Sequence, residues 1–234
     1  MEGLSTRLAT VRAAIAPAAR RVGRLPEQVG IVAVTKMFPP DAVASALAAG
    51  LTDIGENYVQ EAKGKRMQVP GGTWHLIGGL QRNKVRAAVA IFDRIHTVDH
   101  LDLATALDAA ARAAGRRLPV LVQVNVAGEA TKRGADPDAI AGLCATILGL
   151  RGLVLDGLMT IGPASEDPES ARPCFRALRL LRDDVAQRLG VELPHLSMGM
   201  SDDFAIAVEE GATLVRLGRV LFGGRRASAW REGT

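Results

Sequence analysis

Short apolar segments alternate with amphipathic segments along almost the whole chain. The apolar segments predict strands at 30–35, 51–54, 74–77, 94–98, 118–125, 153–159, 195–197 and 213–217. Between them, apolar residues recur at helical spacing and predict helices at 40–49, 57–66, 81–90, 100–114, 137–148, 168–189 and 203–210. Because the strands read as unbroken apolar runs, the pattern indicates a parallel sheet that is covered on both faces.

An amphipathic segment at 3–22 precedes the first strand. Its apolar residues, including Leu8, Val11 and Ile15, fall at helical spacing with arginines between them. Pro17 predicts a kink or an early end of this helix, because proline has no backbone N–H to donate. We expect this helix to stand outside the repeating units or to close their ring.

The repeating strand–helix units define the fold class. Their alternation implies parallel strands joined by right-handed crossovers. Eight units within 234 residues match a single (β/α)8 TIM-type barrel of the α/β class, one domain over residues 1–234. An open doubly wound sheet is the alternative. No Gly-x-Gly-x-x-Gly fingerprint follows the first strand and no low-complexity linker divides the chain, so we favour the barrel.

The composition narrows the classes of function. The chain is 48% hydrophobic but only 3% aromatic, and its net charge of +4 is spread thinly. Nucleic-acid-binding proteins concentrate basic residues and stacking aromatics, so we expect no nucleic-acid partner. No run of about 18 uncharged apolar residues exists, so we expect no membrane span. Cys144 and Cys174 lack metal-ligand spacing, and we interpret them as reduced packing residues of a cytoplasmic protein.

Lys36 stands at the end of the first predicted strand. The apolar run 31–34 leads directly into Thr35 and Lys36, and Pro39 and Pro40 end the strand. In parallel α/β folds, ligands bind at the carboxyl ends of the strands. Partial burial there favours the uncharged amine, a usable nucleophile for a carbonyl group. The alternative is a lysine that simply ends a strand in solvent.

Other polar residues lie in or directly after the later strands. Asn57 follows the second strand, and Ser201 follows the seventh. His75 lies within the third strand, and Arg216 ends the eighth just before the turn at Gly218. Ser201 is a natural N-cap for a helix starting at residues 202–203, and glycine turns beside a helix start suit an anion such as phosphate. A phosphate site opposite an amine fits pyridoxal 5′-phosphate. The alternative is that Ser201 only caps a helix and the glycines only turn.

The motifs carrying these residues closely resemble the pyridoxal phosphate homeostasis proteins, a YggS-like and PROSC-like family. The resemblance spans residues 4–226, and its motifs are AVTK at 33–36, GENYVQE at 55–61, HLIGGLQRNK at 75–84, SMGMSDD at 197–203 and VRLG at 215–218. It implies one barrel similar to the N-terminal domain of alanine racemase.

The resemblance also implies roles for individual residues. Lys36 would carry the cofactor as a Schiff base, Ser201 and the Gly218 turn would hold its phosphate, and Arg216 would face the pyridine nitrogen. Asn57 and His75 would line the pocket near the ring. The chain departs from many relatives at Arg219, where they carry Ser or Thr. A hydroxyl contact to the phosphate is then missing, or the backbone N–H suffices.

Arg216 bears on whether the protein is an enzyme. Arginine only donates hydrogen bonds, so the ring nitrogen would stay neutral and the ring would be a weak electron sink. Racemases of this fold add a tyrosine base from a second domain, whereas here the single tyrosine, Tyr58, lies in the second loop. We therefore expect a monomeric carrier in pyridoxal phosphate homeostasis, with apo-enzymes as recipients. The alternative is a pyridoxal phosphate-dependent enzyme such as an amino-acid racemase.

The loop after the fifth predicted strand carries a second candidate lysine. Lys132 lies in a polar, glycine-flanked segment that opens on the same barrel face as Lys36. We expect Lys132, positioned by Glu129, to assist cofactor transfer without holding the cofactor at rest. The alternative is a solvated loop lysine.

Overall fold

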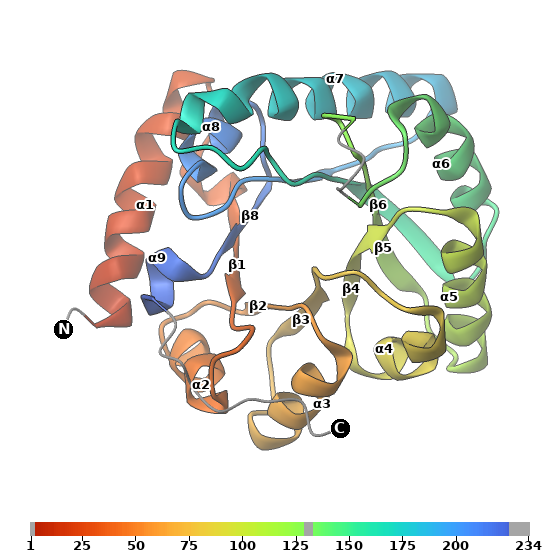
Figure 1. The fold of residues 1–234 in the computed structure, drawn as a ribbon, viewed down its shortest axis with the longest axis horizontal. Coiled ribbons are helices and arrows are strands. Elements are labelled where there is room, and N and C mark those ends of the chain that lie inside the picture. The colour runs from red at the N-terminus through yellow and green to blue at the C-terminus, as the bar shows by residue number, and fades with distance from the viewer. Residues whose placement is uncertain (1–2, 129–132, 225–234) are drawn as a thin grey trace.

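The computed structural model describes residues 3–128 and 133–224, and it shows a closed barrel of parallel strands (Figure 1). The strands are β1 (Gly30–Val34), β2 (Asp53–Glu56), β3 (Thr73–Leu76), β4 (Arg94–Val98), β5 (Leu118–Gln123), β6 (Leu153–Met159), β7 (His195–Ser197) and β8 (Leu214–Leu217). Each strand pairs with the next, and β8 returns to pair with β1 in the register Gly30 to Leu214. The predicted α/β barrel is confirmed, and the open sheet is wrong.

Helices surround the barrel on all sides in Figure 1. They are α1 (Leu4–Arg21), α2 (Pro40–Ala48), α3 (Val59–Gln68), α4 (Val85–Ile91), α5 (Leu101–Ala113), α6 (Ile140–Leu148), α7 (Arg172–Leu189), α8 (Phe204–Glu209) and α9 (Arg219–Phe222). Outward-facing strand residues such as Ile31, Ile54 and Trp74 pack with the apolar faces of these helices in one core. Burial of this layer is the main force that holds the barrel together.

Pro17 does not end the first helix. The helix α1 continues through Pro17 to Arg21. Pro17 is on the exposed side, where the backbone carbonyl that loses its N–H partner can bond to water. Leu8, Val11, Ile15, Ala18 and Ala19 of α1 are buried against the barrel, and this packing outweighs the cost of the proline.

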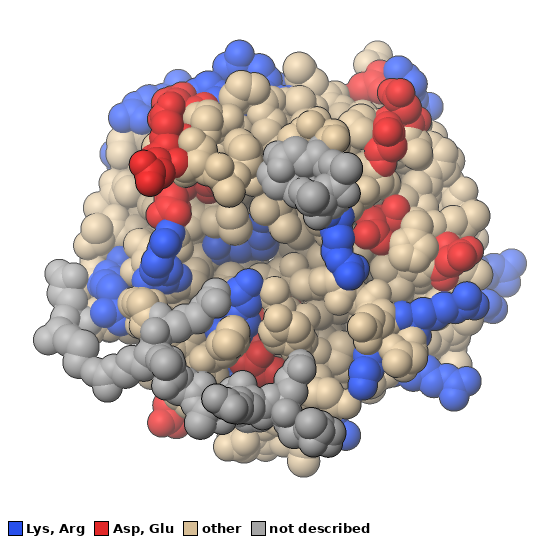
Figure 2. Space-filling view, viewed as in Figure 1, with Lys and Arg blue, Asp and Glu red and all other residues tan. Residues whose placement is uncertain are grey.

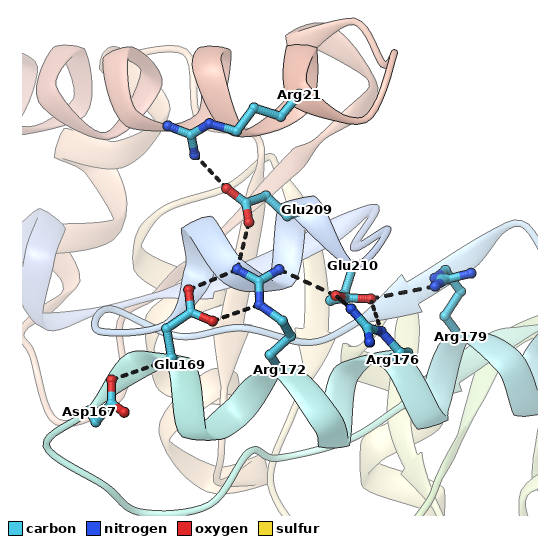
Figure 3. Close-up of polar contacts among 8 residues, drawn as sticks. All are labelled: Arg21, Asp167, Glu169, Arg172, Arg176, Arg179, Glu209 and Glu210. Carbon is cyan, nitrogen blue, oxygen red and sulfur yellow. Dashed lines mark hydrogen bonds and ion pairs between the residues drawn. The ribbon is translucent and has the colours of Figure 1, made fainter.

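An ion-pair network joins α7, α8 and α1 beside the barrel (Figure 3). The nearly buried carboxylate of Glu210 pairs with three arginines of α7, namely Arg172, Arg176 and Arg179. Arg172 also reaches Glu209, which pairs in turn with Arg21 of α1. Burial by itself would raise the pKa of Glu210, but hydrogen bonds from Arg176 and Arg172 lower it overall. The network holds α8 in place, and α8 follows directly after the Ser201 loop.

In the part of the chain that the structure describes, no helix is both long enough and apolar enough to cross a membrane. The same residues contain no group of three histidines, cysteines or acidic residues able to hold a metal ion. Cys144 and Cys174 are both buried and not disulfide-bonded, and burial raises the pKa of the Cys144 thiol to about 12.

Candidate functional site

A pocket of about 490 Å³ opens at the carboxyl ends of β1, β2, β7 and β8. Five of the residues singled out from the sequence line it: Lys36, Asn57, Ser201, Arg216 and Gly218. Apolar side chains complete the wall, among them Val34, Phe38 and Ile77. Figure 2 shows the hollow in the middle of this face, with basic side chains around it.

The chain forms a tight turn around Lys36. Phe38 N–H donates to the carbonyl oxygen of Thr35 at 3.0 Å, which closes the turn. Met37 has a φ of 62°, a left-handed conformation that costs a side-chain-bearing residue energy. Its N–H donates to Glu61 Oε1 at 2.5 Å, and this bond holds the strained residue in place. The turn thus directs Lys36 from the end of β1 into the pocket wall.

A buried cluster lies directly behind this turn. Lys65 Nζ lies 2.6 Å from each of three acceptors, which are the Thr35 carbonyl oxygen, Glu56 Oε1 and Glu61 Oε1. The Thr35 hydroxyl also donates to Glu56 Oε1 at 2.6 Å. The side chains of Lys65 and Glu56 have no exposed surface. Through Lys65 and Glu61, the cluster binds the backbone on both sides of Lys36.

The sequence interpretation missed this cluster. One signal was available, since Glu61 and Lys65 are four residues apart and lie on one face of a helix. That spacing is more often a solvated surface pair, so it did not indicate burial. Only the packing of α3 on the carboxyl ends of β1 and β2 buries the side chains of Glu56, Glu61 and Lys65.

Burial raises the pKa of Glu56 to about 7, although the charge of Lys65 opposes this shift. In the interval from about 4.5 to 7, the folded state therefore binds more protons than the unfolded state. We expect this residue to lower the free energy of unfolding by up to about 3 kcal/mol as pH rises through that interval. The difference in unfolding free energy between wild type and Glu56→Gln, measured by urea denaturation from pH 4.5 to 8, should follow this slope.

The matched control for this pH dependence is Glu27→Gln, which changes an exposed carboxylate. The unfolding free energy of Glu27→Gln should change with pH in the same way as that of the wild type. A Glu56→Gln profile that also runs parallel to the wild type would contradict the assignment.

Arg216 lies in β8 with only 5% of its surface exposed, and it lines the floor of the pocket. Its Nη1 donates to Ser197 Oγ at 2.8 Å, and its Nη2 donates to the Thr160 carbonyl oxygen at 2.9 Å. Burial lowers the pKa of Arg216 to about 10, partly offset by the negative charge of Asp203. The guanidinium therefore stays protonated at neutral pH and can only donate hydrogen bonds.

Ser201 lies in the pocket but does not cap a helix, so the predicted N-cap is wrong. The helix α8 begins at Phe204, with Asp203 in the N-cap position. Asp203 Oδ1 accepts the Met200 N–H at 2.6 Å and so closes the turn that Ser201 was expected to close. Ser201 Oγ instead accepts the Val220 N–H at 3.3 Å. This bond leaves the hydroxyl proton of Ser201 available to a ligand.

The turn after β8 brings two more features to the pocket. Gly218 precedes the short helix α9, and a Cβ at this position would lie 3.3 Å from the Val34 carbonyl oxygen. Arg219 lines the rim and forms an ion pair with Asp202. Arg219, the departure from the family pattern noted above, is therefore a cation at the edge of the same pocket.

Asn57 is held by a close approach of the next loop. A Cβ on Gly78 would lie 2.5 Å from the Asn57 carbonyl oxygen, a separation that real Cβ atoms do not show. Glycine at 78 therefore lets the loop after β3 pack against Asn57 and keeps this residue at the pocket wall.

His75 does not lie where the sequence placed it. It is fully buried and is not among the described residues that line the pocket. Its Nδ1 is 2.8 Å from His96 Nε2, and its Nε2 is 2.8 Å from Asp53 Oδ1. The expectation that His75 lines the pocket is wrong, because its position in β3 points the ring into the barrel interior. Lys132 and Glu129 lie outside the described residues.

Comparisons with known proteins agree with this geometry. Residues 8–226 match the family model described as the N-terminal domain of alanine racemase. The chain is 41% identical over 222 residues to the pyridoxal phosphate homeostasis protein of Aquifex aeolicus, with 94% of this chain and 97% of the relative covered. It is also 41% identical over 233 residues to the protein of that name from Escherichia coli K12, with 96% and 98% covered.

A solved structure shows the same likeness. PipY of Synechococcus elongatus, determined with PLP bound, has a TM-score of 0.83 and 37% sequence identity to this chain. The match covers 94% of this chain and 100% of PipY. Similarity at this level extends over the whole barrel and includes all strands that surround the pocket.

Proposed function

The chain belongs to the pyridoxal phosphate homeostasis protein family, and from that premise we propose that it binds pyridoxal 5′-phosphate in the pocket around Lys36. The observation that supports this most directly is the grouping of an amine, a hydroxyl and a buried guanidinium in one pocket of about 490 Å³. These are the donors that an aldehyde, a phosphate and a pyridine nitrogen require.

Each residue has a defined part in this proposal. Lys36 holds the cofactor through its amine as a Schiff base, and its turn is kept in place by Glu61 and Lys65. Ser201 donates a hydrogen bond from its hydroxyl group to the phosphate, beside the turn at Gly218. Arg216 donates an N–H to the ring nitrogen from the pocket floor. Asn57 lies at the wall between β2 and β3 and borders the ring.

We propose that the protein stores or delivers the cofactor within the cell. Pyridoxal phosphate supplies an electron sink when its ring nitrogen is protonated, and a donor-only arginine leaves that nitrogen neutral. Tyr58, the only tyrosine, is half exposed and is not among the described residues of the pocket wall. Apo forms of pyridoxal phosphate-dependent enzymes are the proposed recipients of the cofactor.

The competing function is that of an amino-acid racemase or a related enzyme. The visible spectrum of the purified protein mixed with pyridoxal phosphate, followed by assays with D- and L-amino acids, separates the two. We expect a yellow protein with marginal turnover. Robust turnover that survives rigorous purification and disappears in Lys36→Ala would overturn the carrier proposal. A colourless protein that binds no cofactor would overturn both.

Ser201→Ala should weaken the binding of pyridoxal phosphate by roughly 1–3 kcal/mol, because a hydrogen bond to a charged phosphate is lost. The binding of pyridoxal, which has no phosphate, should be weak and nearly unchanged by the substitution. Titration of the visible absorbance with each compound measures both effects. Ser45→Ala on the exposed face of α2 is the control. Equal affinity of the wild type for pyridoxal and its phosphate would refute the assignment.

A further inference from the structure

A continuous chain of hydrogen bonds crosses the barrel interior and ends on the pocket floor. Asp53 Oδ1 lies 2.8 Å from His75 Nε2, and His75 Nδ1 lies 2.8 Å from His96 Nε2. His96 Nδ1 lies 2.9 Å from Ser197 Oγ, which accepts from Arg216 at 2.8 Å. Because β4 and β7 are not neighbours in the sheet, the link from His96 to Ser197 passes through the interior.

The residues at the two ends of this hydrogen-bond chain determine which group donates in each of its bonds. Arg216 can only donate, so the Ser197 oxygen accepts there and its hydroxyl proton is directed to His96. At the other end, an ionised Asp53 can only accept, so His75 Nε2 carries the proton of that bond. With both rings neutral, every intermediate bond then points the same way, from Arg216 to Asp53. Both histidines are consequently protonated on Nε2 and accept on Nδ1.

Burial and the surrounding charges keep the His96 ring neutral. Burial lowers the pKa of His96 well below its ordinary value, and the nearby charges of Arg216 and Arg94 lower it further. Burial alone would raise the pKa of Asp53, but the hydrogen bond from His75 lowers it overall, so the carboxylate stays ionised.

The two interior arginines have carboxylates of their own. The negative charge of Asp203 acts on Arg216, and Arg94 Nη2 lies 2.8 Å from Asp156 Oδ2. His195 lies beside this pair, with its Nε2 at 3.9 Å from Asp156. A further proton on His75 Nδ1 would face the Nε2–H of His96, and one on His96 Nδ1 would face the hydroxyl proton of Ser197. With neutral rings, every donor in the hydrogen-bond chain faces an acceptor.

We propose that His75, His96 and Ser197 are positioning residues that hold Arg216 as an N–H donor toward the ring nitrogen of the bound cofactor. Ser197 and the Thr160 carbonyl engage two nitrogens of the guanidinium and set its plane. The guanidinium has further N–H donors besides these two, and Arg216 lines the pocket. The identity of the ligand rests on the proposed function. The direction of hydrogen-bond donation from Arg216 to Asp53 rests only on the geometry of the barrel interior.

The first test concerns the protein without cofactor. Long-range ¹H–¹⁵N correlation spectra of the apo-protein report which ring nitrogen of each histidine carries the proton. We expect both rings to carry their proton on Nε2 and to accept on Nδ1 at neutral pH, and we expect His96 to stay neutral between pH 5 and 8. The surface residue His100, with 60% of its side chain exposed, serves as the solvent-exposed reference in the same spectra. Protonation on Nδ1, or titration of His96 within that range, would overturn the proposal.

The second test uses a cofactor analogue as the probe. In 1-deazapyridoxal 5′-phosphate a C–H group replaces the ring nitrogen, so the analogue cannot accept the N–H of Arg216. Ser197→Ala and His96→Gln should each weaken pyridoxal phosphate binding by about tenfold, as expected for loss or misdirection of one charge-assisted hydrogen bond. Binding of the deaza analogue should change by less than about twofold in the same variants.

The control is His195→Gln. His195 lies near the same interior, but its ring is hydrogen-bonded to Thr213 and is not part of the hydrogen-bond chain. This substitution should affect the two probes equally. If Ser197→Ala and His96→Gln weakened the binding of both probes equally, these residues would have a merely structural role. If neither probe bound more weakly, the residues would have no role in binding. Either result would overturn the proposal. Failure of the wild type to bind pyridoxal phosphate would refute the proposed function, while the apo-protein spectra would still decide the direction of the chain.

Discussion

Lys36→Ala should eliminate the visible absorbance that pyridoxal phosphate acquires on binding to the wild-type protein. Lys36 lines the pocket together with Ser201 and Arg216, and its amine is the group that would condense with the aldehyde. Borohydride reduction of the loaded wild type, followed by peptide mapping, should place the covalent adduct on Lys36. The variant should yield no adduct at this site, and it should retain only the weaker, non-covalent binding through the phosphate.

Lys63→Ala is the matched control, because Lys63 is a lysine on the exposed face of α3 and does not line the pocket. It should leave the absorbance and the adduct unchanged. An adduct found only on other lysines of the wild type, or unaltered absorbance in Lys36→Ala, would contradict the assignment. Circular dichroism of Lys36→Ala should match that of the wild type, which excludes unfolding as the reason for a lost signal.

Lys65→Met should destabilise the protein by about 3–5 kcal/mol, the usual cost of removing one partner from a buried ion pair. The substitution leaves the carboxylates of Glu56 and Glu61 behind the Lys36 turn without their cation. It also removes the donor to the Thr35 carbonyl oxygen. Urea denaturation at pH 7, followed by circular dichroism, measures the change in unfolding free energy.

Two further variants sharpen this test. Lys63→Met on the exposed face of the same helix should change stability by less than about 0.5 kcal/mol. Adding Glu56→Gln to Lys65→Met should recover part of the loss, because the side chain at 56 then no longer has to be buried as a charge or take up a proton on folding. A loss below about 1 kcal/mol in Lys65→Met, or no recovery in the double variant, would mean that the cluster is not the buried ion-pair site described here.

The sequence by itself determined the architecture of this protein. Unbroken apolar runs report strands that are buried on both faces, and their regular alternation with helices leaves few topologies other than a parallel barrel. The gathering of Lys36, Ser201 and Arg216 in one pocket followed from the same information. Once the strands are parallel, all their carboxyl ends open on one face, so the position of a residue at a strand end already places it near the others.

Only the tertiary structure decided which buried polar groups face the pocket and which face one another. His75 was expected at the pocket wall, but it bonds to His96, which in turn reaches Ser197 across 101 residues of chain. The spacing of Glu61 and Lys65 is typical of a surface pair, but Lys65 is buried behind β1 and β2. Apolar periodicity records whether a position is buried, whereas a polar side chain in the interior takes its role from partners that distant segments bring to it.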